Sequence, residues 1–136
     1  MIRALKAGAR YFGLVFAAGA LLGTLRVLTL EPVVGAPGAV LAELPVMLAV
    51  AWIACGLVVR RSSVSTRFGD RGVMGVTAFA LLLLAELTLS LLLGRTLVEH
   101  LSLHRQLDAQ LGLMGQLAFA GFPMIRLRGA SRAPER

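Results

Sequence analysis

The chain has 136 residues, of which 57% are hydrophobic and 15% charged, with a formal net charge of +7. Soluble domains are nearer half apolar and a quarter charged, and the apolar excess here is gathered in blocks long enough to cross a bilayer core of roughly 30 Å. A chain of this length with four such blocks has no room for a separate soluble domain. Because the basic residues lie between and beyond the blocks, and not on one folded face, we expect no nucleic-acid partner.

The apolar blocks predict an all-α fold, an integral membrane four-helix bundle. The first block follows three basic residues and contains "AGA" at residues 18–20, as a cleaved secretory signal would. It continues ten residues further, which is too long for a signal and favours a retained span. The run "EPVVGAPG" at residues 31–38 predicts a turn before the second block. We expect spans over residues 11–30, 39–59, 72–94 and 109–125, and a basic tail over residues 126–136.

The basic residues predict the orientation of these spans. Eleven of the 14 lysines and arginines lie before the first span, between the second and third, or after the fourth. The other two connections hold only Arg95 and Arg105, and Arg26 lies inside the first span. Since cytoplasmic segments are enriched in basic residues, both termini should be cytoplasmic. Arginine outnumbers lysine thirteen to one, which suggests a bacterial source and therefore a multi-pass protein of the inner membrane.

Three charged residues interrupt the apolar spans. A charge at a helix centre costs roughly 2.5–3.5 kcal/mol on insertion scales, so such residues usually face the bundle and find partners. With a rise of 1.5 Å per residue, Arg26 lies roughly 8 Å outward of its span midpoint, Glu43 about 9 Å and Glu86 about 4–5 Å. We therefore expect one intramembrane charge network at a common depth, to which the polar stripes of the third and fourth spans add Ser90 and Gln116.

Small residues at helical spacing predict where the helices meet. Gly19 and Gly23 form a G-x-x-x-G pair on the same stripe as Arg26, and Gly112 lies one turn before Gln116. Small residues let membrane helices approach closely. We therefore expect Gly19, Gly23 and Gly112 at helix–helix contacts.

The charge network leaves more than one function open. If Arg26 bridges both carboxylates, it fixes how the helices pack in the lipid bilayer, in a homo-oligomer or an accessory subunit of a membrane complex. With two acids and one base, however, one carboxylate lacks a full partner and could hold a proton near neutral pH. The alternative is therefore a small transporter or channel that uses Glu86 and Glu43 as proton-coupled or cation sites. A lipid or small-molecule site is a third interpretation.

The connection over residues 95–108 holds both histidines. His100, His104 and Asp108 recur every four residues, so on one helix face they could hold a divalent metal, with Glu99 nearby. Free interfacial histidines are much commoner than ligands, and H-E-x-x-H is absent. There is also no G-x-S-x-G motif and no P-loop, and both histidines lie outside the spans. We therefore expect neither an enzyme nor a haem or other cofactor.

Three short runs resemble a known group of proteins. They are "GTLRVL" at residues 23–28, the "EP" that follows it, and "AELPVML" at residues 42–48. Together they resemble small, uncharacterised four-span inner-membrane proteins of proteobacteria, over most of the chain. The resemblance implies a membrane location and carries over no activity.

Overall fold

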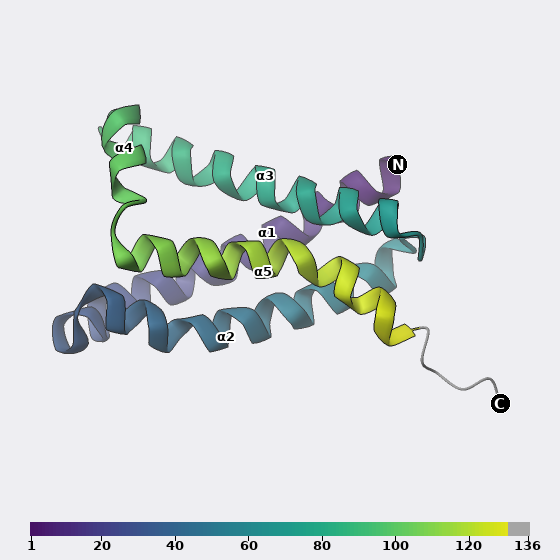
Figure 1. The fold of residues 1–136 in the computed structure, drawn as a ribbon, viewed down its shortest axis with the longest axis horizontal. Coiled ribbons are helices and arrows are strands. Elements are labelled where there is room, and N and C mark those ends of the chain that lie inside the picture. Colours follow the sequence, from purple (N-terminus) through teal and green to yellow (C-terminus); the bar gives the residue numbers. More distant parts are fainter. Residues whose placement is uncertain (131–136) are drawn as a thin grey trace.

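The structure is a computed structural model that describes residues 1–130, with side chains described as far as Arg126. The described chain is helical and contains no strand, which confirms the predicted all-α class. Residues 131–136 of the predicted tail lie outside the described part. The helices are α1 (Ile2–Thr29), α2 (Glu31–Ser62), α3 (Phe68–Leu92), α4 (Leu97–Leu103) and α5 (Leu107–Ala130), as Figure 1 shows.

Four long helices lie side by side, and the short helix α4 joins two of them. α1 packs against α2 and α3, and α5 packs against the same two helices. α1 and α5 therefore occupy opposite corners of the arrangement. The N-terminus, the connection between α2 and α3 and the C-terminal end of α5 gather at one end, called here the N-terminal end (Figure 1). The other end, called the α4 end, holds α4 and the connection between α1 and α2.

Three of these helices are long and apolar enough to cross a membrane, namely α1, α2 and α3. α5 is not among them, and it contains the segment predicted as the fourth span. Each of the three helices extends beyond its predicted span at the N-terminal end of the molecule. There, the polar residues that flank the apolar blocks continue the helix. Apolar composition predicts how much of a helix lies in lipid, and it does not fix where the helix stops.

The turn predicted over residues 31–38 is shorter than expected. α2 begins at Glu31, and only Gly35 leaves the helical conformation, with φ 76° and ψ 164°. Pro32 lies in the first turn of α2, where its missing N–H has no intrahelical partner to lose. The positive φ of Gly35 is available to glycine without strain and lets the chain reverse within a few residues. The prolines and glycines thus produce one break instead of a loop.

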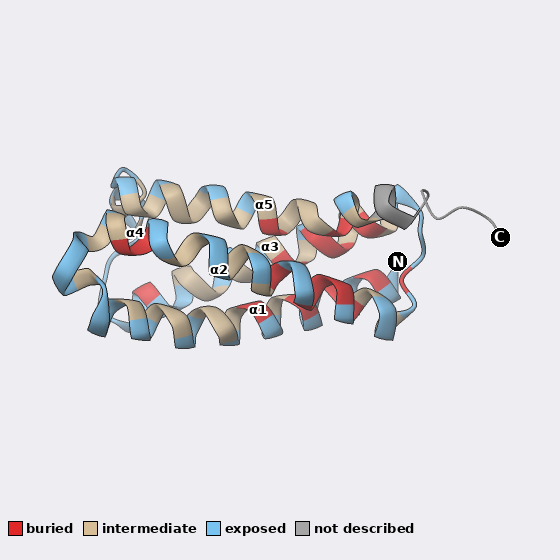
Figure 2. Cartoon of the chain, turned by 90° about the horizontal axis from the view of Figure 1, so that it is seen from below, coloured by how far each residue is buried: buried red, intermediate tan, exposed pale blue. Residues whose placement is uncertain are grey.

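The N-terminal half of the molecule holds the closely packed core. Buried residues concentrate there in Figure 2, and they form one continuous apolar cluster. The largest of its fully buried side chains include Tyr11 and Met74. The members of the cluster come from all four long helices and from the connection between α2 and α3: Ala4, Ala7, Tyr11, Val15, Ala51, Ala54, Cys55, Val58, Val64, Met74, Ala78 and Phe119.

A hydrogen bond across the centre of the molecule links α1 to α5. The Tyr11 hydroxyl donates to the carbonyl oxygen of Phe119 at 3.0 Å, and the two rings stack with centroids 4.4 Å apart. In a regular helix that carbonyl would accept from the N–H four residues later, but that residue is Pro123, which has none. Tyr11 therefore satisfies a carbonyl that the helix itself leaves without a donor.

The closest helix contacts use glycines other than those predicted. A Cβ at Gly8 would lie 2.7 Å from the Met74 carbonyl oxygen, and a Cβ at Gly75 would clash with the Ala120 carbonyl oxygen. By contrast, a Cβ at Gly23 or Gly112 would meet nothing within 4 Å. The prediction that Gly23 and Gly112 mark helix contacts is therefore wrong. At Gly19, a Cβ would reach only ordinary contact with the methyl group of Met47, at 3.4 Å.

Two arginines fasten the N-terminal end. The Arg71 side chain is buried, and it donates from Nε to the Ser65 carbonyl at 3.1 Å, which holds the connection between α2 and α3. The Arg126 guanidinium lies over the Trp52 ring, 4.3 Å from its centroid, and donates to the Trp52 carbonyl oxygen at 2.8 Å. These contacts join α5 to α2 at the same end as the packed core.

Candidate functional site: a polar cavity at the α4 end

The half of the molecule nearest α4 is hollow. Two adjoining cavities lie there, with volumes of about 320 Å³ and 440 Å³. We call the first the α4-end cavity, because residues of α4 line it, and the second the central cavity, because it lies among α1, α2, α3 and α5. Both volumes fall in the range of small-molecule pockets. The residues shared by the two linings are Arg26, Val40, Glu86, Leu89, Gly112 and Gln116.

The central cavity ends at the packed core. Val15, Ala51 and Phe119 line the cavity and also belong to the buried cluster. The molecule is therefore hollow from the α4 end as far as this level and closed beyond it by the core that Tyr11 fastens. Gly112 faces the space shared by both cavities, since no atom lies near the position its Cβ would take. A side chain larger than that of glycine at position 112 would extend into this space.

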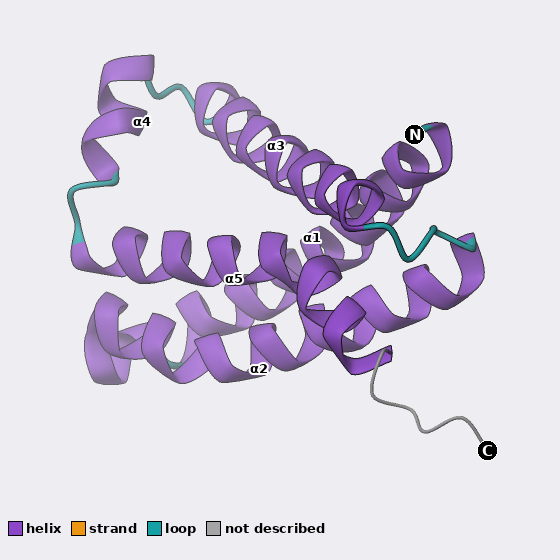
Figure 3. Cartoon of the chain, turned by 45° about the vertical axis from the view of Figure 1, so that its right-hand side comes forward, coloured by secondary structure: helices purple, strands orange, loops and turns teal. Residues whose placement is uncertain are grey.

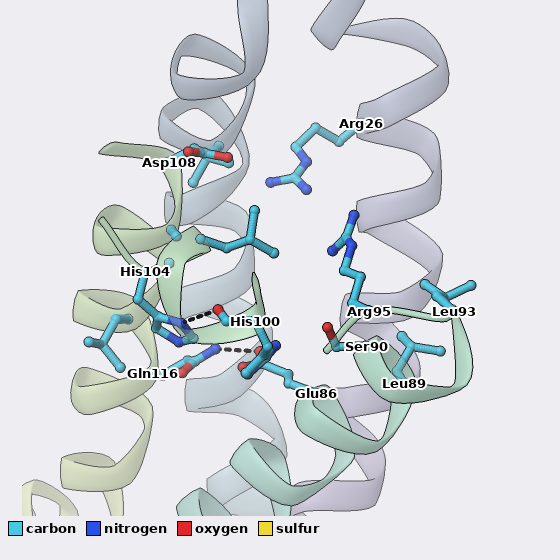
Figure 4. A pocket seen from close by; sticks show the side chains of 15 residues that line it. Arg26, Glu86, Leu89, Ser90, Leu93, Arg95, His100, His104, Asp108 and Gln116 are labelled. Atoms are coloured by element: carbon cyan, nitrogen blue, oxygen red, sulfur yellow. Dashed lines mark hydrogen bonds between the residues drawn. The ribbon is translucent and has the colours of Figure 1, made fainter. Parts of the chain in front are cut away.

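Glu86 lies where the two cavities adjoin. Its Oε1 accepts a hydrogen bond from Nε2 of Gln116, which joins α3 to α5 (Figure 4). His104 lines the α4-end cavity together with it. Glu86 makes no ion pair within the described residues, although it lines the same space as Arg26. Glu86 is therefore a carboxylate that faces both cavities.

Arg26 pairs with one carboxylate and not with two. Its Nε lies 3.2 Å from Oε2 of Glu43, and the exposed fractions of the two side chains are 26% and 13%. This ion pair joins α1 to α2, as the Glu86–Gln116 hydrogen bond joins α3 to α5. The predicted bridge from Arg26 to both acids is therefore not formed. The polar residues that line the central cavity form two separate pairs, Arg26 with Glu43 and Glu86 with Gln116.

The α4-end cavity contains a second set of polar groups. In Figure 4 the side chains of Arg26 and Arg95 reach into the same space, with the Ser90 hydroxyl below them. Ser90 is only 5% exposed, and its hydroxyl has no hydrogen-bond partner. His100, His104 and Asp108 complete the polar lining. The cavity therefore presents several groups that have directional hydrogen bonds still to make.

Helix α4 positions the histidines over this cavity. Thr96 caps its N-terminus by accepting from the Glu99 backbone N–H, and the Glu99 carboxylate in turn accepts from the Thr96 backbone N–H at 2.7 Å. This reciprocal capping box starts a helix of seven residues that has no buried residue of its own. The Thr96 backbone and hydroxyl hydrogen bonds lower the pKa of Glu99.

The residues predicted as metal ligands do not form a metal site. His100 and His104 pack edge to face with ring centroids 5.2 Å apart, and the His104 Nδ1 lies 3.2 Å from the His100 carbonyl oxygen. Over the described residues, no group of three His, Cys, Asp or Glu side chains is arranged to hold a metal ion. Asp108 falls in α5, beyond the end of α4, so the spacing of four does not continue along one helix.

The sequence interpretation included most of this lining and missed Arg95. Arg26, Glu43, Glu86 and Gln116 line the central cavity, and Ser90 lines the α4-end cavity with the histidines and Asp108. The sequence places Arg95 in a connection between two spans, and the structure adds it to the lining of the α4-end cavity. Its position directly after Gly94, whose φ is +82°, is the signal that could have placed it back over the bundle.

The chain was compared with protein-family models, with curated proteins and with solved structures. No family model matches it, and neither a curated protein nor a solved structure gives a significant match. The resemblance to four-span inner-membrane proteins therefore stays a prediction.

Proposed function

We propose that the chain is a non-enzymatic, four-span protein of a bacterial inner membrane, with both termini in the cytoplasm. α1, α2 and α3 are apolar enough to cross, and α5 has 24 residues, which at 1.5 Å per residue is about 36 Å, enough for a core of roughly 30 Å. α5 also packs between α2 and α3 along the bundle. The basic N-terminal end would then lie on the cytoplasmic side, and the α4 end would face outward.

In this orientation the protein acts as a small transporter with Glu86 as its protonatable group. The observation that carries the proposal is the position of Glu86, which lines both cavities and has a neutral amide, Gln116, as its hydrogen-bond partner. Ionisable groups inside a membrane protein that face an open cavity commonly mark the path of a proton or an ion. A solute could enter from the α4 end as far as the closed core, with Glu86 beside it.

The test is the protonation of Glu86 in the purified full chain in lipid. Infrared difference spectra across pH should show a carboxylic acid signal that disappears in Glu86→Gln. Asp108→Asn, which removes another carboxylate of the cavity, should retain the signal. If Glu86 stays ionised at every accessible pH, it cannot carry a proton and the transport proposal is wrong.

A second candidate function has one observation in its favour. The Arg26–Glu43 ion pair is mostly shielded from solvent and joins two helices, as a packing network in an oligomer or an accessory subunit would. For this function, Arg26→Gln should disrupt the purified assembly, measured by its mass in detergent, while Glu86 gives no infrared signal. An unchanged assembly in Arg26→Gln would remove this candidate.

A further inference from the structure

Three side chains that line the α4-end cavity have hydrogen-bond donors that are not used within the described residues. Ser90 has a buried hydroxyl that makes no hydrogen bond, and Figure 4 shows it facing into the cavity. Arg26 pairs with Glu43 through Nε only, which leaves the outer nitrogens of its guanidinium facing the cavity. Arg95 reaches the same space and makes no ion pair within the described residues. The three groups come from α1, α3 and the connection after α3.

Arg26 and Arg95 bring two guanidinium groups to one cavity, and Glu43 pairs with only the first of them. The guanidinium fork matches the oxygen atoms of carboxylate and phosphate groups, which it can bind through two hydrogen bonds at once. A serine hydroxyl at the base of the same space supplies a further donor. The chemistry that satisfies all three groups is therefore a carboxylate or a phosphate.

The central cavity extends this site with a mainly apolar space. Its lining includes Val15, Phe16, Met47, Leu82 and Phe119, and its volume is about 440 Å³. Gly112 belongs to the linings of both cavities, and a Cβ at this position would meet no atom within 4 Å. A ligand with an anionic head at Arg26 and Arg95 could therefore extend an apolar chain past Gly112 toward the packed core.

We propose that the cavity binds an amphiphile with one anionic head group, a carboxylate or a phosphate, whose apolar chain lies in the central cavity. The inference rests on the proposed transport function and names its class of ligand. The cavities also contain acidic side chains, so their net charge does not select an anion. The hydrogen-bond donors of Arg26, Arg95 and Ser90 would select it. The charged and titratable groups that line the same cavities are Arg26, Glu43, Arg95, His100, His104 and Asp108.

Glu86 gives this binding a dependence on protons. An anionic head beside an ionised Glu86 is repelled, whereas a protonated Glu86 removes the repulsion and can still interact with Gln116. Binding of the amphiphile and uptake of a proton should therefore favour one another, as linkage requires. The transporter would carry the anion together with a proton.

The test is binding of radiolabelled dodecanoate to the purified full chain in a neutral maltoside detergent. The detergent also has an apolar chain and can compete for the apolar part of the site. Competitors with the same chain and different head groups therefore report on the polar part of the site. Dodecyl phosphate should displace the label, whereas inorganic phosphate and dodecyltrimethylammonium should not. Arg95→Gln should weaken binding by about tenfold or more, as expected for loss of a hydrogen bond to a charged group. Its control is Arg105→Gln, an arginine from the same end that lines neither cavity, which should leave binding unchanged.

A second pair of variants tests the path of the apolar chain. Gly112→Leu should abolish dodecanoate binding, because its side chain projects into the shared space. Gly13→Leu should not, because Gly13 is exposed and lines neither cavity. Equal elution of all variants in gel filtration shows that the fold is intact.

The outcomes separate this inference from the proposed function. Displacement of dodecanoate by inorganic phosphate would mean that the site binds a free anion. Displacement of dodecanoate by dodecyltrimethylammonium in the wild type, but not in Glu86→Gln, would mean that the site binds a cation. Either result overturns the amphiphile proposal, as does the absence of dodecanoate binding. In each of these cases an infrared signal from Glu86 would leave the transport function standing. Dodecanoate binding with an infrared-silent Glu86 would instead support the ligand class and overturn the proton-coupled mechanism.

Discussion

Removal of the Tyr11 hydroxyl should destabilise the closed half of the bundle through one carbonyl group. The Tyr11 hydroxyl is the donor for the Phe119 carbonyl, whose intrahelical donor is lost because Pro123 has no N–H. Tyr11→Phe keeps the stacked ring and removes only that hydrogen bond. The carbonyl is then buried without a donor, and the expected loss in free energy of unfolding is about 1–3 kcal/mol.

A double-mutant cycle with Pro123→Ala tests the stated cause. Alanine at position 123 supplies an N–H that can donate to the Phe119 carbonyl, so Tyr11→Phe should cost less in this background. We expect the cost to fall by roughly 1 kcal/mol. Alanine is smaller than proline, and this loss of volume changes stability by itself. The change is the same in Pro123→Ala and in Tyr11→Phe/Pro123→Ala, so it cancels when the two variants are compared.

Unfolding in mixed detergent micelles, followed by helical circular dichroism, measures each member of the cycle. The control is Pro45→Ala, which changes another proline within a helix, at an exposed position of α2. In that background Tyr11→Phe should cost as much as in the wild type. An equal cost of Tyr11→Phe with and without Pro123 would refute the idea that this carbonyl depends on Tyr11.

Two further predictions concern helix contacts and capping. Gly75→Ala should destabilise by about 1–3 kcal/mol, because its Cβ would clash with the Ala120 carbonyl and the two helices must separate. Gly23→Ala should be neutral or stabilising by up to about 1 kcal/mol in the same unfolding assay, and the reverse order would contradict the assigned contacts. The Glu99 pKa is lowered by its hydrogen bonds with Thr96, so its capping contribution is complete above the unfolded-state pKa and is lost as pH falls through the lower folded-state value. In the wild type, the carbon chemical shifts of α4 should have helical values at neutral pH and lose them only in acid. In Glu99→Ala, α4 should lack helical values already at neutral pH. If α4 stays helical both in acid and in Glu99→Ala, the capping argument is wrong.

The sequence identified the polar residues of the site but not how they pair. Buried charges are costly in an apolar span, so Arg26, Glu43 and Glu86 had to face the interior, and helical spacing placed Gln116 and Ser90 with them. Which donor meets which acceptor depends on which helices are neighbours. α1 packs against both α2 and α3, and Arg26 forms its ion pair with Glu43 of α2, a choice that no periodic pattern contains.

The glycines show the same limit. A glycine can permit a close contact or leave an open space, and both appear identical in a sequence. Gly75 is pressed against a backbone carbonyl, whereas Gly112 faces a cavity, although both lie in long helices. Only the position of the neighbouring helix distinguishes a contact from a cavity.

The sequence by itself predicted a helical chain with apolar blocks that can cross a membrane, because hydrophobicity and its period are local properties of the chain. Three of the four blocks lie in helices that are long and apolar enough to do so. The tertiary structure alone decided that one half is packed and the other hollow, that Glu86 lies where two cavities adjoin, and that Arg95 returns over them. The physical reason is that a cavity is formed by side chains far apart in the chain, so its shape depends on helix positions that no single segment encodes.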